Sequence, residues 1–153
     1  MAELATATGV DGMVGGQYMD VAGLHRDADE LRRLHELKTG RLIGASVECV
    51  LLLAGMNSPD TSDFCEFASE LGVLFQIVDD ILDVTGTDAA LGKPRGSDER
   101  HGKRTYVSEF GLDGARELAT RSHRHARASL AAAAPGGAPE LEQITDFIAT
   151  RSS

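Results

Sequence analysis

Residues 75–84 read FQIVDDILDV and predict a helix that is apolar on most of its sides. At ~100° per residue, the polar side chains of this segment fall within an arc of about 100°, and apolar side chains take the rest of the circumference. The polar members are Gln76, Asp79, Asp80 and Asp83. The segment is therefore expected to be a largely buried helix with one narrow acidic stripe.

The acidic stripe predicts a divalent cation. Its three carboxylates crowd together without a cation among them, which costs free energy through like-charge repulsion, and the apolar surroundings increase that cost. Hard oxygen ligands on successive turns suit Mg²⁺, which carboxylates typically share with substrate phosphates. A plain acidic helix face at a domain edge is the alternative. An EF-hand is disfavoured, because Ile81 and the helical pattern break the required spacing of ligands.

A glycine-rich and basic loop is expected directly after this helix, over residues 85–105. Glycines let backbone N–H groups approach an anion, and lysines supply compact positive charge. The loop does not have Walker A spacing, since Lys103 is followed by Arg104. By itself, this loop fits a solvated connection as well as it fits a phosphate-binding loop. Because it follows the acidic stripe, it favours a site that handles phosphate.

The rest of the chain has helical periodicity, and no segment alternates long enough to predict a half-buried strand. Helices are expected over residues 3–19, 29–53, 62–84, 112–134 and 139–150. The predicted fold class is all-α, an antiparallel helix bundle. Within residues 29–53, Lys38 and Thr39 interrupt an apolar face, one turn after His35.

The bulk composition is that of an ordinary soluble domain. The 153 residues are 42% hydrophobic and 25% charged, with a net charge of -9, which argues against a nucleic acid or an anionic membrane as partner. The longest apolar run, near residues 50–54, is too short to span a bilayer, and no secretory signal is evident. Cys49 and Cys65 lie in helical patterns, which predicts reduced cysteines in a cytoplasmic protein; a disulfide is the alternative.

Four segments in order resemble the trans-isoprenyl diphosphate synthases of the polyprenyl synthetase family, enzymes that make geranyl, farnesyl, geranylgeranyl and longer polyprenyl diphosphates. They are residues 12–17 with Asp20, His35 with Lys38 and Thr39, residues 76–83, and residues 92–106. The resemblance implies that the bundle is the C-terminal half of the isoprenoid synthase fold. It also implies that Mg²⁺ draws the diphosphate off an allylic substrate, and that isopentenyl diphosphate then attacks the allylic cation.

The resemblance also implies roles for particular residues. Asp79 would bind Mg²⁺ directly, with Asp80 and Asp83 as further or water-mediated ligands. Thr39 and Gln76 would turn their oxygens toward the developing cation. The residues expected to hold the diphosphates are Lys38, Lys93, Lys103 and Gln17.

The family's first aspartate-rich motif has no match in this sequence, where Asp79-Asp80 is the only paired aspartate. Residues 1–153 are therefore expected to be the C-terminal portion of a synthase domain and to be inactive alone. Self-association, or association with the missing N-terminal half, is expected. Two alternatives are a non-catalytic or split-enzyme subunit that binds another synthase chain, and a class I terpene cyclase relative. The aspartates of the stripe speak against the cyclase.

Overall fold

The computed structural model describes residues 1–24, 27–56, 61–86 and 103–151. These residues form helices and connections without a strand, which confirms the predicted all-α class. The helices are α1 (Ala2–Thr8), α2 (Met13–Val21), α3 (Ala28–His35), the π-helix η1 (Glu36–Gly40), α4 (Arg41–Leu53), α5 (Ser62–Thr85), α8 (Tyr106–Ala133) and α9 (Pro139–Thr150).

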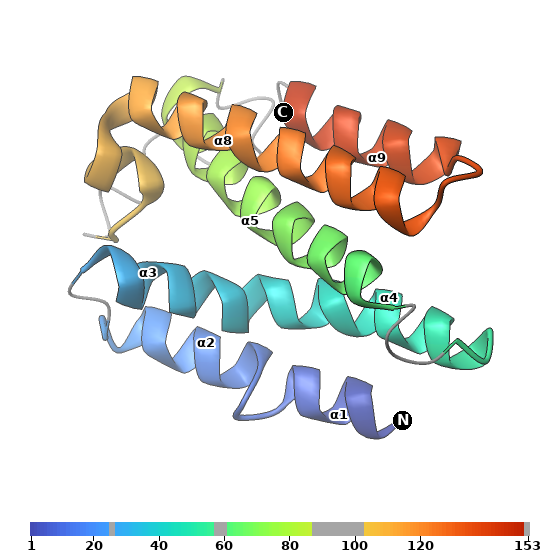
Figure 1. Cartoon of the computed structure of the whole chain (residues 1–153). Coiled ribbons are helices and arrows are strands. Elements are labelled where there is room, and N and C mark those ends of the chain that lie inside the picture. Colours follow the sequence, from blue (N-terminus) through green and yellow to red (C-terminus); the bar gives the residue numbers. More distant parts are fainter. Residues whose placement is uncertain (25–26, 57–60, 87–102, 152–153) are drawn as a thin grey trace.

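The helices form antiparallel layers (Figure 1). α1 and α2 lie along the continuous α3–η1–α4 helix, α5 crosses that helix obliquely, and α8 and α9 cover the opposite side of α5. α5 is thus the central element. The acidic stripe occupies its C-terminal half.

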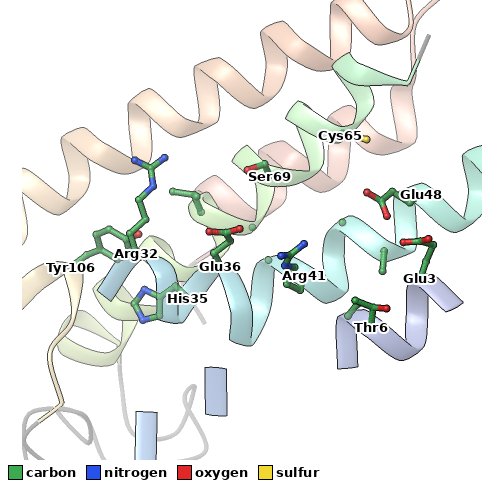
Figure 2. A pocket seen from close by; sticks show the side chains of 16 residues that line it. Glu3, Thr6, Arg32, His35, Glu36, Arg41, Glu48, Cys65, Ser69 and Tyr106 are labelled. Carbon is green, nitrogen blue, oxygen red and sulfur yellow. The ribbon is translucent and has the colours of Figure 1, made fainter. Parts of the chain in front are cut away.

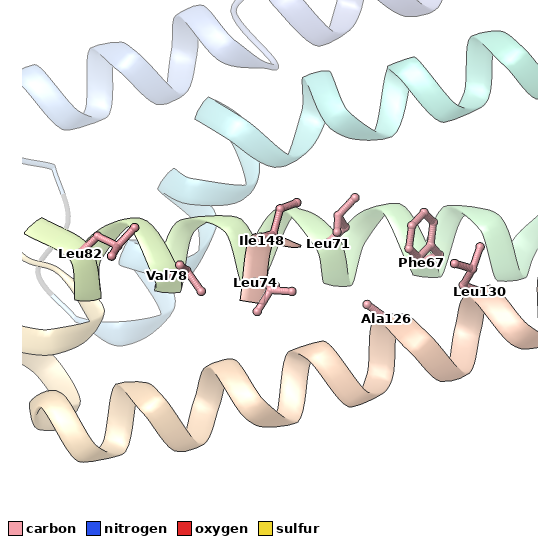
Figure 3. Close-up of a cluster of buried hydrophobic side chains, with 8 residues drawn as sticks. All are labelled: Phe67, Leu71, Leu74, Val78, Leu82, Ala126, Leu130 and Ile148. Atoms are coloured by element: carbon pink, nitrogen blue, oxygen red, sulfur yellow. The ribbon is translucent and has the colours of Figure 1, made fainter. Parts of the chain in front are cut away.

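The core is built on the apolar side of α5 (Figure 3). Its side chains recur at helical spacing and pack against α8 and α9, because a helix that is apolar on several sides must be covered by neighbours. The cluster comprises Phe67, Leu71, Leu74, Val78 and Leu82 from α5, Ala126 and Leu130 from α8, and Ile148 from α9. Each fully buried large side chain contributes about 1.5–3 kcal/mol, so this cluster fixes α5 against the C-terminal helices.

The first predicted helix is two helices. The expected helix over residues 3–19 ends at Thr8 and resumes at Met13. At the bend, a Cβ on Gly12 would lie 2.0 Å from the carbonyl oxygen of Ala7, so only glycine fits there. Gly16, on the next turn, would place a Cβ 2.4 Å from the backbone nitrogen of Lys38. Gly12 thus lets the chain bend closely past the end of α1, and Gly16 lets α2 pack directly on the η1 backbone.

The second predicted helix is continuous but not uniformly α-helical. It begins after Asp27, whose Oδ1 accepts a hydrogen bond from the Glu30 backbone N–H at 2.9 Å. At η1 the Arg41 N–H donates to the Glu36 carbonyl, five residues earlier, so this turn holds one residue more than an α turn would. The periodicity of the sequence did not predict this change of register.

α8 begins six residues before the predicted start at residue 112. Thr105 and Ser108 form a reciprocal capping box that opens the helix at Tyr106. Gly111, with a φ of 74°, then breaks the regular helix after one turn. The early start places the N-terminal end of α8 beside the acidic stripe of α5.

Both cysteines are free thiols, as expected. Within the described residues, no helix combines the length and the hydrophobicity needed to cross a membrane.

The bend and α2 carry an exposed apolar stripe on the side away from η1, formed by Val10, Val14, Tyr18 and Val21. We expect the purified chain to self-associate through this stripe, because several exposed apolar side chains on one face favour association. Light scattering should give a mass above that of the monomer. The double variant Val14→Glu, Tyr18→Glu should shift the mass toward the monomer without a change in helix content. A monomeric mass and a sharp cooperative melt for the unchanged chain would contradict this prediction.

Candidate functional site

Asp80 lies inside the protein, although the sequence pattern places it on the same stripe as Asp79. It is 2% exposed. Its Oδ2 accepts a hydrogen bond from the Tyr106 backbone N–H at 2.7 Å, and its Oδ1 accepts one from Gln76 Nε2 at 2.9 Å. The first turn of a helix has N–H groups without helical partners and attracts negative charge. Asp80 therefore joins α5 to the start of α8.

A chain of hydrogen bonds leads from Asp80 to η1. Because a carboxylate only accepts, Gln76 must turn its NH₂ toward Asp80 and its oxygen away. That oxygen accepts a hydrogen bond from Thr39 Oγ1 at 3.3 Å. The close crossing of α5 and η1 makes this contact possible, since a Cβ on Gly72 would lie 3.1 Å from the Gly40 Cα. Thr39 thus commits its proton to Gln76 and leaves the lone pairs of its hydroxyl available.

Asp79 is the accessible carboxylate of the stripe. Its side chain is 50% exposed and lies 3.7 Å from Arg151 Nη2, at the end of α9. The Arg151 guanidinium also lies over the Phe75 ring, with Cζ 4.5 Å from the ring centroid. Asp79 and Asp80 are adjacent in sequence but differ completely in environment.

Two predicted diphosphate ligands meet at Asp20, on α2. Lys38 Nζ lies 2.5 Å and Lys103 Nζ lies 3.1 Å from the same oxygen, Asp20 Oδ2. Burial raises the pKa of Asp20, but the hydrogen bonds and charges of the two lysines outweigh it, so the pKa is lowered overall. Both lysine side chains remain about one-third exposed, at 31% and 38%.

The structure gives the other predicted site residues different places. Gln17 is exposed on α2, three residues before Asp20. Asp83 is buried, one turn beyond Asp79 on α5. Lys93 lies outside the described residues.

Three contributions went unrecognised in the sequence. The N–H of Tyr106 holds Asp80, Arg151 faces Asp79, and Asp20 joins the two lysines. Asp20 falls within a segment that carries the family resemblance, so its position was noted without its role. Tyr106 ends another of those segments, but nothing in the local pattern shows where a backbone N–H points. Arg151 lies close in space to Asp79 only because α9 returns along α5.

A cavity of about 360 Å³ lies beside the site, between α1, α3–α4 and α5 (Figure 2). Its polar lining includes His35, Arg41 and Tyr106, but none of the predicted site residues. The Tyr106 ring stands 5.3 Å from that of His35, and burial raises the pKa of Tyr106 to about 12. Tyr106 is therefore uncharged, and it lines the cavity while its backbone N–H bonds Asp80.

The described residues contain no group of three or more His, Cys, Asp or Glu side chains arranged to hold a metal ion. A cation at Asp79 would need further oxygen ligands from water or from a substrate phosphate, which is how Mg²⁺ is usually held. Asp80 is poorly suited to direct ligation, because protein donors already occupy both of its oxygens.

The sequence pattern of the family described as Polyprenyl synthetase matches residues 2–134. The chain belongs to the polyprenyl synthetase family. Farnesyl diphosphate synthase of Escherichia coli is 40% identical over 157 residues, which cover 99% of this polyprenyl synthetase chain and 52% of the relative. Geranylgeranyl pyrophosphate synthase 9 of Arabidopsis thaliana is 36% identical, with 97% of this chain and 43% of the relative covered.

Solved structures agree with the family assignment. A Helicobacter pylori geranyltransferase, solved with magnesium and isoprenyl diphosphate, matches with a TM-score of 0.80 and 29% identity over 96% of this chain and 48% of that structure. An Arabidopsis medium/long-chain prenyl pyrophosphate synthase in its apo form matches with a TM-score of 0.82 and 27% identity, over 99% and 64%. This chain of the polyprenyl synthetase family spans about half the length of the first relatives it matches.

Proposed function

We propose that this chain supplies the C-terminal half of a prenyltransferase site, which condenses an allylic diphosphate with isopentenyl diphosphate. The observation that carries the proposal is the convergence of Lys38 and Lys103, which are far apart in sequence, on one point. Lys38 is followed by Thr39, which bonds Gln76, and Gln76 is one turn before Asp79 on α5. A lysine and a hydroxyl on η1 thus lie beside the part of α5 that carries the accessible carboxylate.

The residues present suit Mg²⁺ as cofactor. Asp79 would hold it together with waters and substrate phosphate, since its carboxylate is half exposed and its ion pair with Arg151 is long. Mg²⁺ supplies, when bound, charge that stabilises a departing diphosphate. Magnesium in the Helicobacter pylori relative supports this assignment.

The chain's own residues would divide the remaining work. Lys38 and Lys103 would hold the allylic diphosphate and offset its charge as the bond to carbon breaks. Thr39 would face the developing allylic cation with its lone pairs, since its proton is donated to Gln76. Gln76 would keep Thr39 in that orientation, because Asp80 fixes the direction of its amide. Loss of a proton after attack by isopentenyl diphosphate would complete the reaction.

We expect the purified chain to form no product from isopentenyl diphosphate, an allylic diphosphate and Mg²⁺, because it lacks a counterpart of the first aspartate-rich motif. Addition of the N-terminal half of a related farnesyl diphosphate synthase should restore labelled product. Asp79→Ala in the chain should abolish that restored activity. Asp113→Asn also removes one negative charge, but at an exposed position, and should preserve the activity.

Two outcomes would contradict the proposal. Restored activity that survives Asp79→Ala would assign the chain a non-catalytic, supporting role, which is the alternative of an associating subunit. Product formed by the chain alone and lost in Asp79→Ala would show that self-association completes the site.

A further inference from the structure

Asp20 is the most enclosed of the three charged groups that meet beside η1. Its side chain is 8% exposed, whereas both lysines that bond it are about one-third exposed. The two ammonium groups share one oxygen, Oδ2, so they are no farther apart than the sum of their two distances to it. Asp20 is thus the buried member of the cluster, and the two lysines are the members that solvent or a ligand can reach.

The position of Asp20 is fixed by backbone packing. Gly16 lies one helical turn before Asp20 on α2 and therefore on the same face. Its Cα hydrogens take up the space next to Lys38, where a Cβ would approach the backbone within 2.4 Å. α2 is thus seated on η1 at the turn that directs the Asp20 carboxylate to Lys38. Lys103 reaches the same oxygen from the segment that leads into α8.

The three charged groups that meet at Asp20 Oδ2 are more positive than negative. They are two ammonium groups and one carboxylate, and each ammonium donates to the same carboxylate oxygen. Without the carboxylate, the two like charges would repel each other, and both flexible side chains would be free to separate.

We propose that Asp20 is a positioning residue, which gathers Lys38 and Lys103 into one binding site for the diphosphate of the substrate. This inference rests on the proposed function and deepens it. If Asp20 did not position the lysines, it would lower the affinity for diphosphate, because a carboxylate repels a diphosphate bound beside it. Removal of its charge therefore separates the two roles by the direction of the effect.

The test is calorimetric titration of the 153-residue chain with inorganic pyrophosphate in the absence of divalent metal, which isolates the lysines from the metal site. Asp20→Asn keeps the shape of the side chain and removes its charge. We expect pyrophosphate to bind about tenfold more weakly to Asp20→Asn, and Asp20→Glu to recover part of the loss. Asp113→Asn is the matched control, since this aspartate is 94% exposed and should leave affinity unchanged. Circular dichroism melts establish that each variant is folded.

A double-mutant cycle shows whether Asp20 acts through the lysine. In a Lys38→Gln background, Asp20→Asn should have little further effect on pyrophosphate binding. Equal losses in both backgrounds would overturn the positioning role, as would unchanged or tighter binding by Asp20→Asn alone. Such results would leave the proposed prenyl transfer intact. Absence of pyrophosphate binding by the unchanged chain would overturn both the inference and the diphosphate site of the proposed function.

Discussion

Asp80→Ala should destabilise the chain by about 3 kcal/mol, whereas Asp79→Ala should change stability by less than about 0.5 kcal/mol. Alanine at position 80 leaves the N–H of Tyr106 and the amide of Gln76 without their acceptor in a buried place. It also removes the negative charge at the N-terminal end of α8. Alanine at position 79 loses only a long, half-exposed ion pair with Arg151.

Thermal melts followed by circular dichroism should show a drop of about 10 °C for Asp80→Ala, given the usual scaling for a domain of this size. Asp80→Asn should lie between the two, because its single side-chain oxygen can accept from only one of the two donors. Binding measurements should give the reverse order: Asp79→Ala should lose the Mg²⁺-dependent component of pyrophosphate binding while remaining folded. Equal melting temperatures for the two alanine variants would refute the anchoring role of Asp80.

Gly16→Val should destabilise the chain by about 2 kcal/mol and abolish pyrophosphate binding. Any side chain at this position meets the backbone of Lys38, which cannot rotate away as a flexible side chain would. α2 must then move off η1 and take Asp20 with it, so the variant should lose binding even at temperatures where its helices persist.

Gly44→Ala is the control for adding a side chain at a helical glycine where the space is open. Gly44 lies within α4, and a Cβ there would meet nothing within 4 Å. Alanine should therefore stabilise the chain by about 0.5–1 kcal/mol through helix propensity alone. Chemical denaturation of both variants measures the difference. Gly16→Val with wild-type stability and binding would show that α2 is not seated on η1 as described.

Strong local periodicity made some helices predictable. α5 was expected over residues 62–84 and spans Ser62–Thr85, and α9 was expected over the same residues that it occupies. The bend at Gly12 and the early start of α8 were missed. The bend depends on a close approach to the Ala7 backbone, which the helical periodicity does not show. The Thr105–Ser108 capping box is local, but it lies within a segment that read as loop because of its glycines.

The structure brings some of the predicted site residues together, since Lys38 and Lys103 meet at Asp20 and Thr39 bonds Gln76, but the sequence did not predict these contacts. A helical wheel treats Asp79 and Asp80 alike, and only the arrival of α8 buries one of them. Likewise, nothing in the sequence between Lys38 and Lys103 reveals that both reach one oxygen of Asp20. Roles of this kind arise from tertiary contacts between segments that are distant along the chain.

The π turn at Glu36–Gly40 has a consequence for helix phase. It holds one extra residue, so the helix after it is rotated by about 100° relative to an uninterrupted α-helix. α3 therefore packs against α2, while α4, rotated about the same axis, packs against α1 and α5 with a different set of side chains. A one-residue deletion within the turn would preserve helicity and composition yet rotate Thr39 and α4 out of phase with Gln76. The spacing along this helix is thus as much a part of the site as the identity of its side chains.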